Sequence, residues 1–186
     1  MTYRAYAGIG SRRTPDRILS LMSELSGKLA DLGWTLRTGG ADGADQAFLT
    51  GTGTLWAQRK GEYELYLPWP GFNGHRWAKL EEPSIDAFGI AARFHSAWST
   101  LKNDGVRALH ARNVHQILGA DLRTPSRFIL CWTPDGADGV KVPTSQATGG
   151  TGQAIRIAVA WKIPVFNLRR PEHLARIREG LLKNPT

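Results

Sequence analysis

Three glycine-rich turns constrain the fold of this 186-residue chain more than any other feature. Each is in a position to follow a β-strand, because an apolar or β-rich run precedes it and a run compatible with helix follows it. The turns are GIGSR at 8–12, TGGADGAD at 38–45 and GGTGQ at 149–153. In a parallel sheet such turns meet at the carboxyl ends of the strands, where backbone N–H groups and helix N-termini favour anions, most often phosphate. Together they predict a ligand that carries phosphate.

Segments typical of strands alternate with segments typical of helices along the whole chain. Strands are predicted at 4–7, 34–38, 64–67, 127–132 and 164–168. Helices are predicted from an N-cap at Thr14 to a stop at Gly33, from Ala44 onward, and over 85–101, 105–118, 152–161 and 171–182. This order predicts an α/β fold: one Rossmann-like, doubly wound, mainly parallel sheet with helices on both faces. We expect a single domain that spans residues 1–186.

The composition is that of an ordinary soluble protein, with 41% hydrophobic and 22% charged residues. No apolar run approaches the ~18 residues that span a bilayer. The N-terminus leads into the first predicted strand without the apolar segment of a signal peptide. The single cysteine, Cys131, lies in an apolar run, which indicates a buried structural thiol. We therefore expect a cytoplasmic protein with no membrane partner.

Positive charge is concentrated in the C-terminal half. The chain has a formal net charge of +8, and residues 100–186 carry 13 basic and 6 acidic side chains. One interpretation is a solvated basic surface that keeps the protein in solution. The other is an electrostatic field that gathers polyanions, either nucleotides or nucleic acid.

The first turn departs from the dinucleotide-binding fingerprint G-x-G-x-x-G. Gly8 and Gly10 are followed by Ser11-Arg12-Arg13, so the third glycine is missing and a standard NAD-binding turn is disfavoured. Ser11 and Arg12 can instead donate hydrogen bonds to a phosphate beside the turn. The alternative is a tight turn with an arginine at the surface.

Four motifs in order resemble the successive motifs of the SLOG superfamily: Gly10-Ser11-Arg12, TGGADGAD at 38–45, Arg112-Asn113 and GGTG at 149–152. That superfamily unites the DNA-processing protein DprA, the YpsA-type proteins, the Lonely Guy phosphoribohydrolases and sensors of nucleotide derivatives. The resemblance covers roughly residues 5–168. It is strongest to short DprA-like proteins of bacteriophages, in which stretches similar to Arg-Asn, CWTPDG and GGTG occur in this order.

The resemblance implies a ligand cleft over the strand ends and a set of binding residues. Glycines of the second turn would let the backbone approach the ligand, and the third turn would cradle a phosphate at a helix N-terminus. Asp42 and Asp45 would bind polar groups of a ribose or base, although Asp45 is equally suited to cap the following helix. Relatives commonly pair through helices near the cleft, which suggests a homodimer. The implied ligand-binding residues are Gly8, Gly10, Ser11, Arg12, Gly39, Gly40, Ala41, Asp42, Asp45, Arg112, Asn113, Gly149, Gly150, Thr151 and Gly152.

Whether the ligand is turned over stays open at the level of sequence. Lonely Guy enzymes resemble Pro-Gly-Gly-x-Gly-Thr-x-x-Glu, and their glutamate takes part in breaking the N-glycosidic bond. Here Arg156 stands in the place of that glutamate, and a cation cannot accept a proton. Asp42 and Asp45 are the remaining catalytic candidates. The histidines show no metal-ligand spacing, so we expect no metal site, and Mg²⁺ arriving with a phosphate ligand remains open.

Three functions follow from these observations. The first is binding of a nucleotide or nucleotide-derived ligand in the cleft. The second is DprA-like binding of single-stranded DNA, which the basic charge and the aromatic residues Trp69, Phe72 and Trp77 favour because aromatic rings stack on bases. The third is N-glycosidic hydrolysis of nucleoside monophosphates, as in the Lonely Guy proteins.

Overall fold

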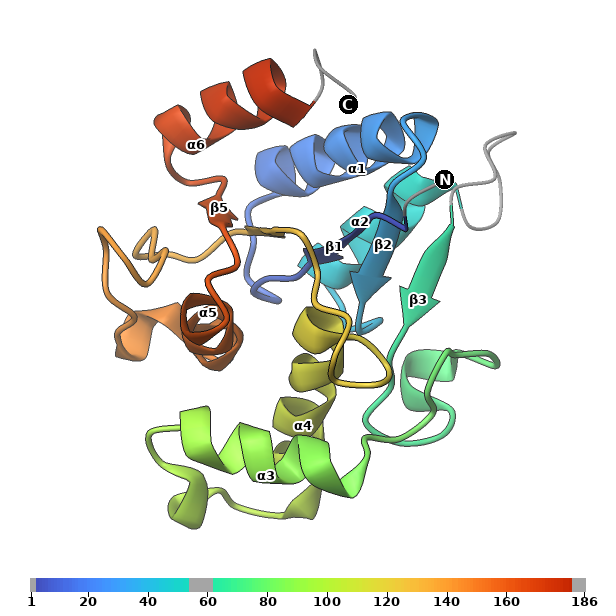
Figure 1. Ribbon diagram of the computed structural model, residues 1–186, viewed down its shortest axis with the longest axis vertical. Helices are drawn as coiled ribbons and strands as arrows, with labels where there is room; N and C mark the ends of the chain where they lie inside the picture. Colours follow the sequence, from blue (N-terminus) through green and yellow to red (C-terminus); the bar gives the residue numbers. More distant parts are fainter. Residues whose placement is uncertain (1–2, 54–61, 182–186) are drawn as a thin grey trace.

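The computed structural model describes residues 3–53 and 62–181, and a single parallel sheet lies at its centre (Figure 1). Five strands pair in the order β3-β2-β1-β4-β5, and each pairing is parallel. The strands are β1 (Ala5–Gly8), β2 (Thr35–Thr38), β3 (Tyr63–Leu65), β4 (Ile129–Cys131) and β5 (Val165–Asn167). The predicted α/β, Rossmann-like fold class is confirmed.

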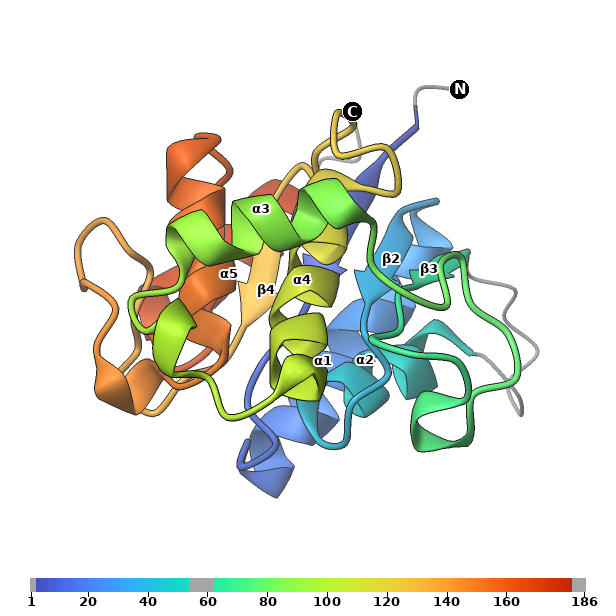
Figure 2. The ribbon, with the colours of Figure 1, turned by 90° about the horizontal axis from the view of Figure 1, so that it is seen from below.

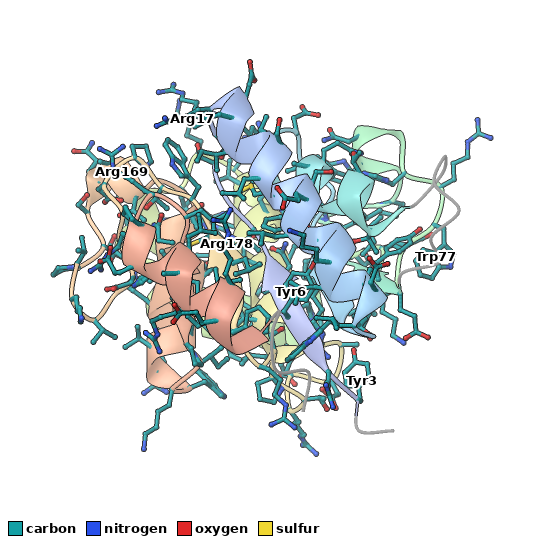
Figure 3. All side chains as sticks on the ribbon, turned by 90° about the horizontal axis from the view of Figure 1, so that it is seen from above. Tyr3, Tyr6, Arg17, Trp77, Arg169 and Arg178 are labelled. Atoms are coloured by element: carbon teal, nitrogen blue, oxygen red, sulfur yellow. The ribbon has the colours of Figure 1, made fainter. Side chains whose placement is uncertain are left out.

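Helices cover both faces of the sheet. One face carries α1 (Asp16–Asp31), α2 (Ala44–Thr52) and α6 (Pro171–Arg176), of which α1 and α6 lie in front of the sheet in Figure 3. The other carries α3 (Ile85–Phe94), α4 (Asp104–Leu118) and α5 (Thr151–Ala160), seen in Figure 2. No helix within the described ranges combines the length and apolar character needed to cross a membrane.

A separate apolar core fills each face, because alternate strand residues point to opposite sides of the sheet. Tyr6 lies in the core under α1 and α2 and stacks on Phe128 with ring centroids 5.4 Å apart. Its neighbour Ala7 lies in the core under α4 and α5, together with Ile129 and Cys131. Burial of the Cys131 side chain agrees with the expected structural thiol. Strands buried on both faces are the expected result of a doubly wound sheet.

The start of α1 differs from the prediction. The helix begins at Asp16 with Pro15 in the N-cap position, and no side chain caps it. The hydroxyl of Thr14 donates instead to the carbonyl of Ser11 at 2.7 Å. The expected N-cap residue therefore stabilises the preceding turn, so the prediction of Thr14 as the cap is wrong.

Two helix ends also differ from the prediction. The helix predicted over 85–101 ends at Phe94, because His95 adopts extended backbone and residues 98–100 form a separate 3₁₀ turn. The last helix is α-helical only to Arg176 and continues as a π-helical turn over Ile177–Leu181. Its predicted end at Leu182 lies outside the described residues. The strands agree with the predicted positions to within two residues at each end where the structure describes them, with β4 the most shortened.

Candidate functional site

A cavity of about 550 Å³ lies beyond the ends of the neighbouring strands β1 and β4. The chain leaves β1 toward α1 on one face of the sheet, and it leaves β4 toward α5 on the other. Such a switch in direction opens a crevice at the carboxyl ends of parallel strands. The lining residues are Ile9, Gly10, Ser11, Arg12, Arg13, Ala41, Asp45, Val106, Leu109, His110, Arg112, Asn113, Gln116, Pro134, Gln146, Ala147, Thr148, Gly149, Gly150, Thr151 and Ala154.

The turn after β1 brings two arginines to the cavity. The Ser11 hydroxyl oxygen accepts a hydrogen bond from the Arg13 backbone N–H at 3.0 Å, and the Ser11 carbonyl accepts from Thr14. These bonds define the turn, while the side chains of Arg12 and Arg13 remain exposed. Exposed guanidinium groups beside a concave surface suit a phosphate, since they offer several charge-assisted hydrogen bonds at little desolvation cost.

The two glycines of the first turn have different surroundings. Gly8 lies within β1, and a Cβ there would meet the ring of Phe48 at 2.6 Å, so Gly8 serves packing beneath the turn. Gly10 lines the cavity, and a Cβ there would lie 2.8 Å from the Cβ of Ala44. The absence of a side chain at Gly10 thus lets the turn lie against the first residue of α2.

The turn after β2 faces the cavity only in part. Ala41 lines it. The carbonyl of Gly40 instead accepts hydrogen bonds from Asn73 Nδ2 at 3.0 Å and from a ring nitrogen of His75 at 3.2 Å, which join it to the loop after β3. Asp42 is exposed and does not line the cavity.

A buried ion pair connects this second turn to α4. Arg112 Nη1 donates to Asp45 Oδ2 at 3.1 Å, and each side chain is only 6% exposed. The Ala41 backbone N–H donates to the same carboxylate at 3.3 Å. Burial raises the pKa of Asp45 and lowers the pKa of Arg112, and the attraction between the two charges opposes both shifts. Asp45 lies inside the first turn of α2, whose N-cap is Gly43, so the capping role considered for Asp45 is wrong.

A polar network joins α4 to α5 on another wall of the cavity. Gln153 Nε2 donates to the carbonyl of Ala91 at 3.2 Å, so its Oε1 atom is the acceptor for His110 Nδ1 at 3.2 Å and for Asn113 Nδ2 at 3.4 Å. His110 must then carry its proton on Nδ1, which leaves Nε2 as an acceptor. Burial, followed by the neighbouring His95, lowers the pKa of His110 to about 4. Near neutral pH this side chain adds no charge to the site.

The segment that leads into α5 matches the predicted phosphate cradle in position. Gly149, Gly150 and Thr151 line the cavity, and Gly150 is the N-cap of α5 with no side-chain cap. The partial positive charge of an uncapped helix N-terminus favours an anion here. Gly152 is not part of the lining. A Cβ at this position would meet the side chain of Thr148 at 3.4 Å.

Asp135 stabilises the segment that precedes the cradle. Its Oδ2 atom accepts hydrogen bonds from the hydroxyls of Ser145 at 2.6 Å and Thr148 at 2.5 Å. Partial burial favours the neutral acid, but these hydrogen bonds outweigh it and lower the pKa of Asp135 to about 2. The carboxylate therefore stays ionised and anchors the 3₁₀ turn Gln146–Thr148 that precedes the glycines.

Arg156 does not line the cavity. Its Nε donates to the carbonyl of Phe94 at 2.8 Å and its Nη1 to the hydroxyl of Thr144 at 3.0 Å. The arginine thus joins α5 to the end of α3 and to the loop before the cradle. Although Arg156 stands in the place of the Lonely Guy glutamate in the sequence, its side chain makes these contacts outside the cavity lining.

The aromatic candidates for base stacking lie outside the cavity lining. Phe72 is buried in the apolar core, so its predicted stacking role is wrong. Trp69 and Trp77 are 40% and 56% exposed, but each makes an edge-to-face contact within its own region, Trp69 with Phe72 and Trp77 with Tyr63. They are surface rings of the loop that follows β3.

The structure brings most of the sequence-predicted residues together. Those that line the cavity are Gly10, Ser11, Arg12, Ala41, Asp45, Arg112, Asn113, Gly149, Gly150 and Thr151. Those that do not are Gly8, Gly39, Gly40, Asp42 and Gly152. Polar lining residues that the sequence reasoning missed are Arg13, His110, Gln116, Gln146 and Thr148. Helical spacing could have found two of them, because Gln116 lies one turn beyond Arg112 and His110 one turn before Asn113. Within the described ranges no three potential metal ligands gather.

Comparison with known proteins gives a likeness in fold. No family model and no curated protein matches the chain. Among solved structures, the chain is similar to DNA processing protein A from Helicobacter pylori, a protein with a described mode of single-stranded DNA binding. The two are 17% identical with a TM-score of 0.55, and the alignment covers 98% of this chain and 75% of the other. At this identity the comparison shows the fold alone, which is loosely consistent with the DprA-like resemblance.

Proposed function

We propose that the cavity binds a nucleotide unit of single-stranded DNA, with the phosphate held at the rim. One observation carries the proposal: Arg12, Arg13 and the uncapped N-terminus of α5 at Gly150 converge on the same cavity. Cationic side chains and helix N–H groups that line the same crevice can bind a phosphodiester together.

Charge supports a polymeric ligand over a single nucleotide. The net charge of +8 provides an attractive field for a polyanion, and the two rim arginines are exposed. The Helicobacter pylori protein, which shares the fold, binds single-stranded DNA. A free nucleotide or nucleotide derivative is the second candidate ligand. A small ligand can enter the cavity completely, and the polar inner wall at Arg112 and Gln116 then offers it hydrogen bonds.

Hydrolysis of the N-glycosidic bond has little support. Asp45 is the one carboxylate among the described lining residues, and it is buried and paired with Arg112. Asp42 and Arg156 lie outside the lining. General acid–base catalysis needs a group that exchanges protons at the reacting bond. We therefore expect no release of free base from nucleoside monophosphates.

Fluorescence anisotropy with labelled single-stranded DNA tests the proposal. The protein should bind the oligonucleotide with an affinity that falls steeply as salt rises, because bound phosphates release counterions. Gly150→Val should abolish binding, since the side chain would occupy the cradle, and open space around Gly150 lets the variant fold.

Gly89→Val is the matched control. Gly89 lies on α3, outside the cavity lining, and a Cβ there also meets open space. Its DNA affinity should equal that of the wild type. Undiminished DNA binding by a folded Gly150→Val protein would contradict the proposed site. Thermal stabilisation by nucleoside monophosphates, with no oligonucleotide binding, would instead favour the second candidate ligand.

A further inference from the structure

Two buried hydrogen-bond donors at the cavity wall have no partner. Within the described part of the chain, Arg112 Nε and Gln116 Nε2 are the buried side-chain nitrogen or oxygen atoms without a hydrogen bond. Their residues are 5% and 1% exposed, and both line the cavity. An unpartnered buried donor destabilises the folded protein, so a pair of them in one cavity wall points to a group that arrives from outside.

The two donors come from the same helix. Arg112 and Gln116 are four residues apart on α4, so their side chains project from the same face of the helix in successive turns. Both nitrogen atoms are buried, and the residues that carry them line the cavity. Binding of one group to both donors therefore requires these side chains to turn toward the cavity.

The charge at this inner wall is already balanced. The guanidinium of Arg112 faces the carboxylate of Asp45, and the pair is shielded from solvent. A second anion here would lose its hydration and gain no unpaired cation in return. The exposed arginines Arg12 and Arg13, which lack such a partner in the cavity lining, are the better phosphate ligands. The inner donors therefore suit a neutral acceptor.

We propose that Arg112 and Gln116 bind the carbonyl oxygen of a nucleobase, so that the cavity prefers thymine, cytosine and guanine over adenine. This inference rests on the proposed binding of a nucleotide unit. A carbonyl oxygen has two lone pairs and accepts from both donors at once, whereas each ring nitrogen of adenine accepts only one hydrogen bond. Adenine thus gains one hydrogen bond fewer than the other bases, which makes its affinity about tenfold lower than theirs.

Gln116→Leu tests the inference by removing one donor and keeping the apolar bulk of the side chain. Anisotropy is measured with labelled dT, dC and dA homopolymers of equal length at one salt concentration. The wild type should bind dT and dC more tightly than dA. The variant should lose about tenfold in affinity for dT and dC and almost none for dA, so that the preference nearly disappears.

Thermal unfolding of the free variant gives an independent measurement. Because leucine replaces an unpartnered amide, the melting temperature of Gln116→Leu should rise. A purely structural glutamine would give a lower melting temperature and an unchanged base preference, and that result overturns the inference. If Gln116→Leu does not fold, Gln116→Met keeps an unbranched side chain of similar length without the donor, and it should reduce dT and dC binding in the same selective way.

The proposed function and this inference fail in different ways. If the wild type binds no oligonucleotide, or if Gly150→Val binds as well as the wild type, the proposed site is wrong. If binding depends on Gly150 but the ratio of dT to dA affinity is equal in the wild type and in Gln116→Leu, only the base-reading inference is wrong. Comparison of the same ratio in two proteins removes the effect of self-stacking in dA.

Discussion

Gly39 and Arg112 show how one residue determines the position of another across the fold. A Cβ at Gly39 would lie 1.1 Å from Arg112 Nη1, so no side chain fits beside the guanidinium. We predict that Gly39→Ala displaces Arg112, breaks its ion pair with Asp45 and lowers the free energy of unfolding by about 3 kcal/mol. Urea denaturation measures this loss.

A double-mutant cycle isolates the contact. In an Arg112→Ala background the guanidinium is gone, so Gly39→Ala should cost much less there than in the wild type. Equal costs in the two backgrounds would mean that Gly39 is required for another reason. Gly89→Ala is the control, because its Cβ meets open space on a helix and alanine is the better helix former.

His110 should make stability depend on pH. Burial lowers its pKa to about 4 in the folded protein, whereas the unfolded side chain titrates near 6.5. Between these values the unfolded state binds more protons, so the free energy of unfolding falls as pH drops from about 6.5 to about 4. After allowance for solvent screening, the contribution of His110 is about 1–2 kcal/mol.

His110→Asn tests this by removing the titrating group. The variant should lose less stability than the wild type when urea denaturation at pH 7 is compared with that at pH 4. His95, His115 and His173 also have lowered pKa values, mainly through burial, so a smaller dependence in the same direction should remain. Identical pH profiles for the wild type and the variant would show that His110 does not titrate as described.

At the scale of elements, Arg156 joins α5 to the end of α3 and to the loop that precedes the cradle. We predict that Arg156→Met lowers the free energy of unfolding by about 1–2 kcal/mol, since two hydrogen bonds are lost, and leaves DNA affinity unchanged. Arg156→Glu should likewise produce no base release, because the side chain lies outside the cavity lining. Chromatographic detection of free base from the Arg156→Glu protein would contradict this placement.

The order of elements was predictable from sequence because local signals mark it. Alternating apolar runs and glycine turns located the five strands and the helices between them, and the parallel sheet followed. The ends of the helices were less predictable, because contacts with residues elsewhere in the fold can override the local sequence pattern. Thr14 is a good N-cap by type, but its hydroxyl bonds to Ser11, and His95 ends α3 without any glycine or proline.

The sequence motifs predicted most of the residues that line the cavity, but they did not predict which of these residues contact one another. Arg112 and Asp45 are 67 residues apart, and no local pattern pairs them. Nothing in the sequence distinguishes Gln116 and His110 from other helix residues, because it does not show which face of α4 lines the cavity. Gly39 leaves space for the guanidinium of Arg112, and the carbonyl of Gly40 accepts a hydrogen bond from the loop after β3. Both roles differ from the ligand contacts expected of these glycines.

At the scale of the whole molecule, positive charge is widely spread, but only some of it lies near the cavity. Arg12 and Arg13 are at its rim, while Arg178 is exposed on the face that carries α1 and α6 (Figure 3). All three contribute equally to the net charge. If DNA binding arose from net charge alone, neutralising any one of them would have the same effect.

We predict that the position of the charge decides the effect. Arg12→Gln and Arg13→Gln should each weaken DNA binding and reduce the slope of log affinity against log salt by about 0.7, the value for one phosphate of a single strand. Arg178→Gln, with the same change in net charge, should leave the slope unaltered. The measurement is anisotropy with one oligonucleotide over a series of salt concentrations. Equal slopes for the three variants would assign binding to the general basic surface, and a reduced slope only for Arg178→Gln would move the DNA to the face of α1 and α6.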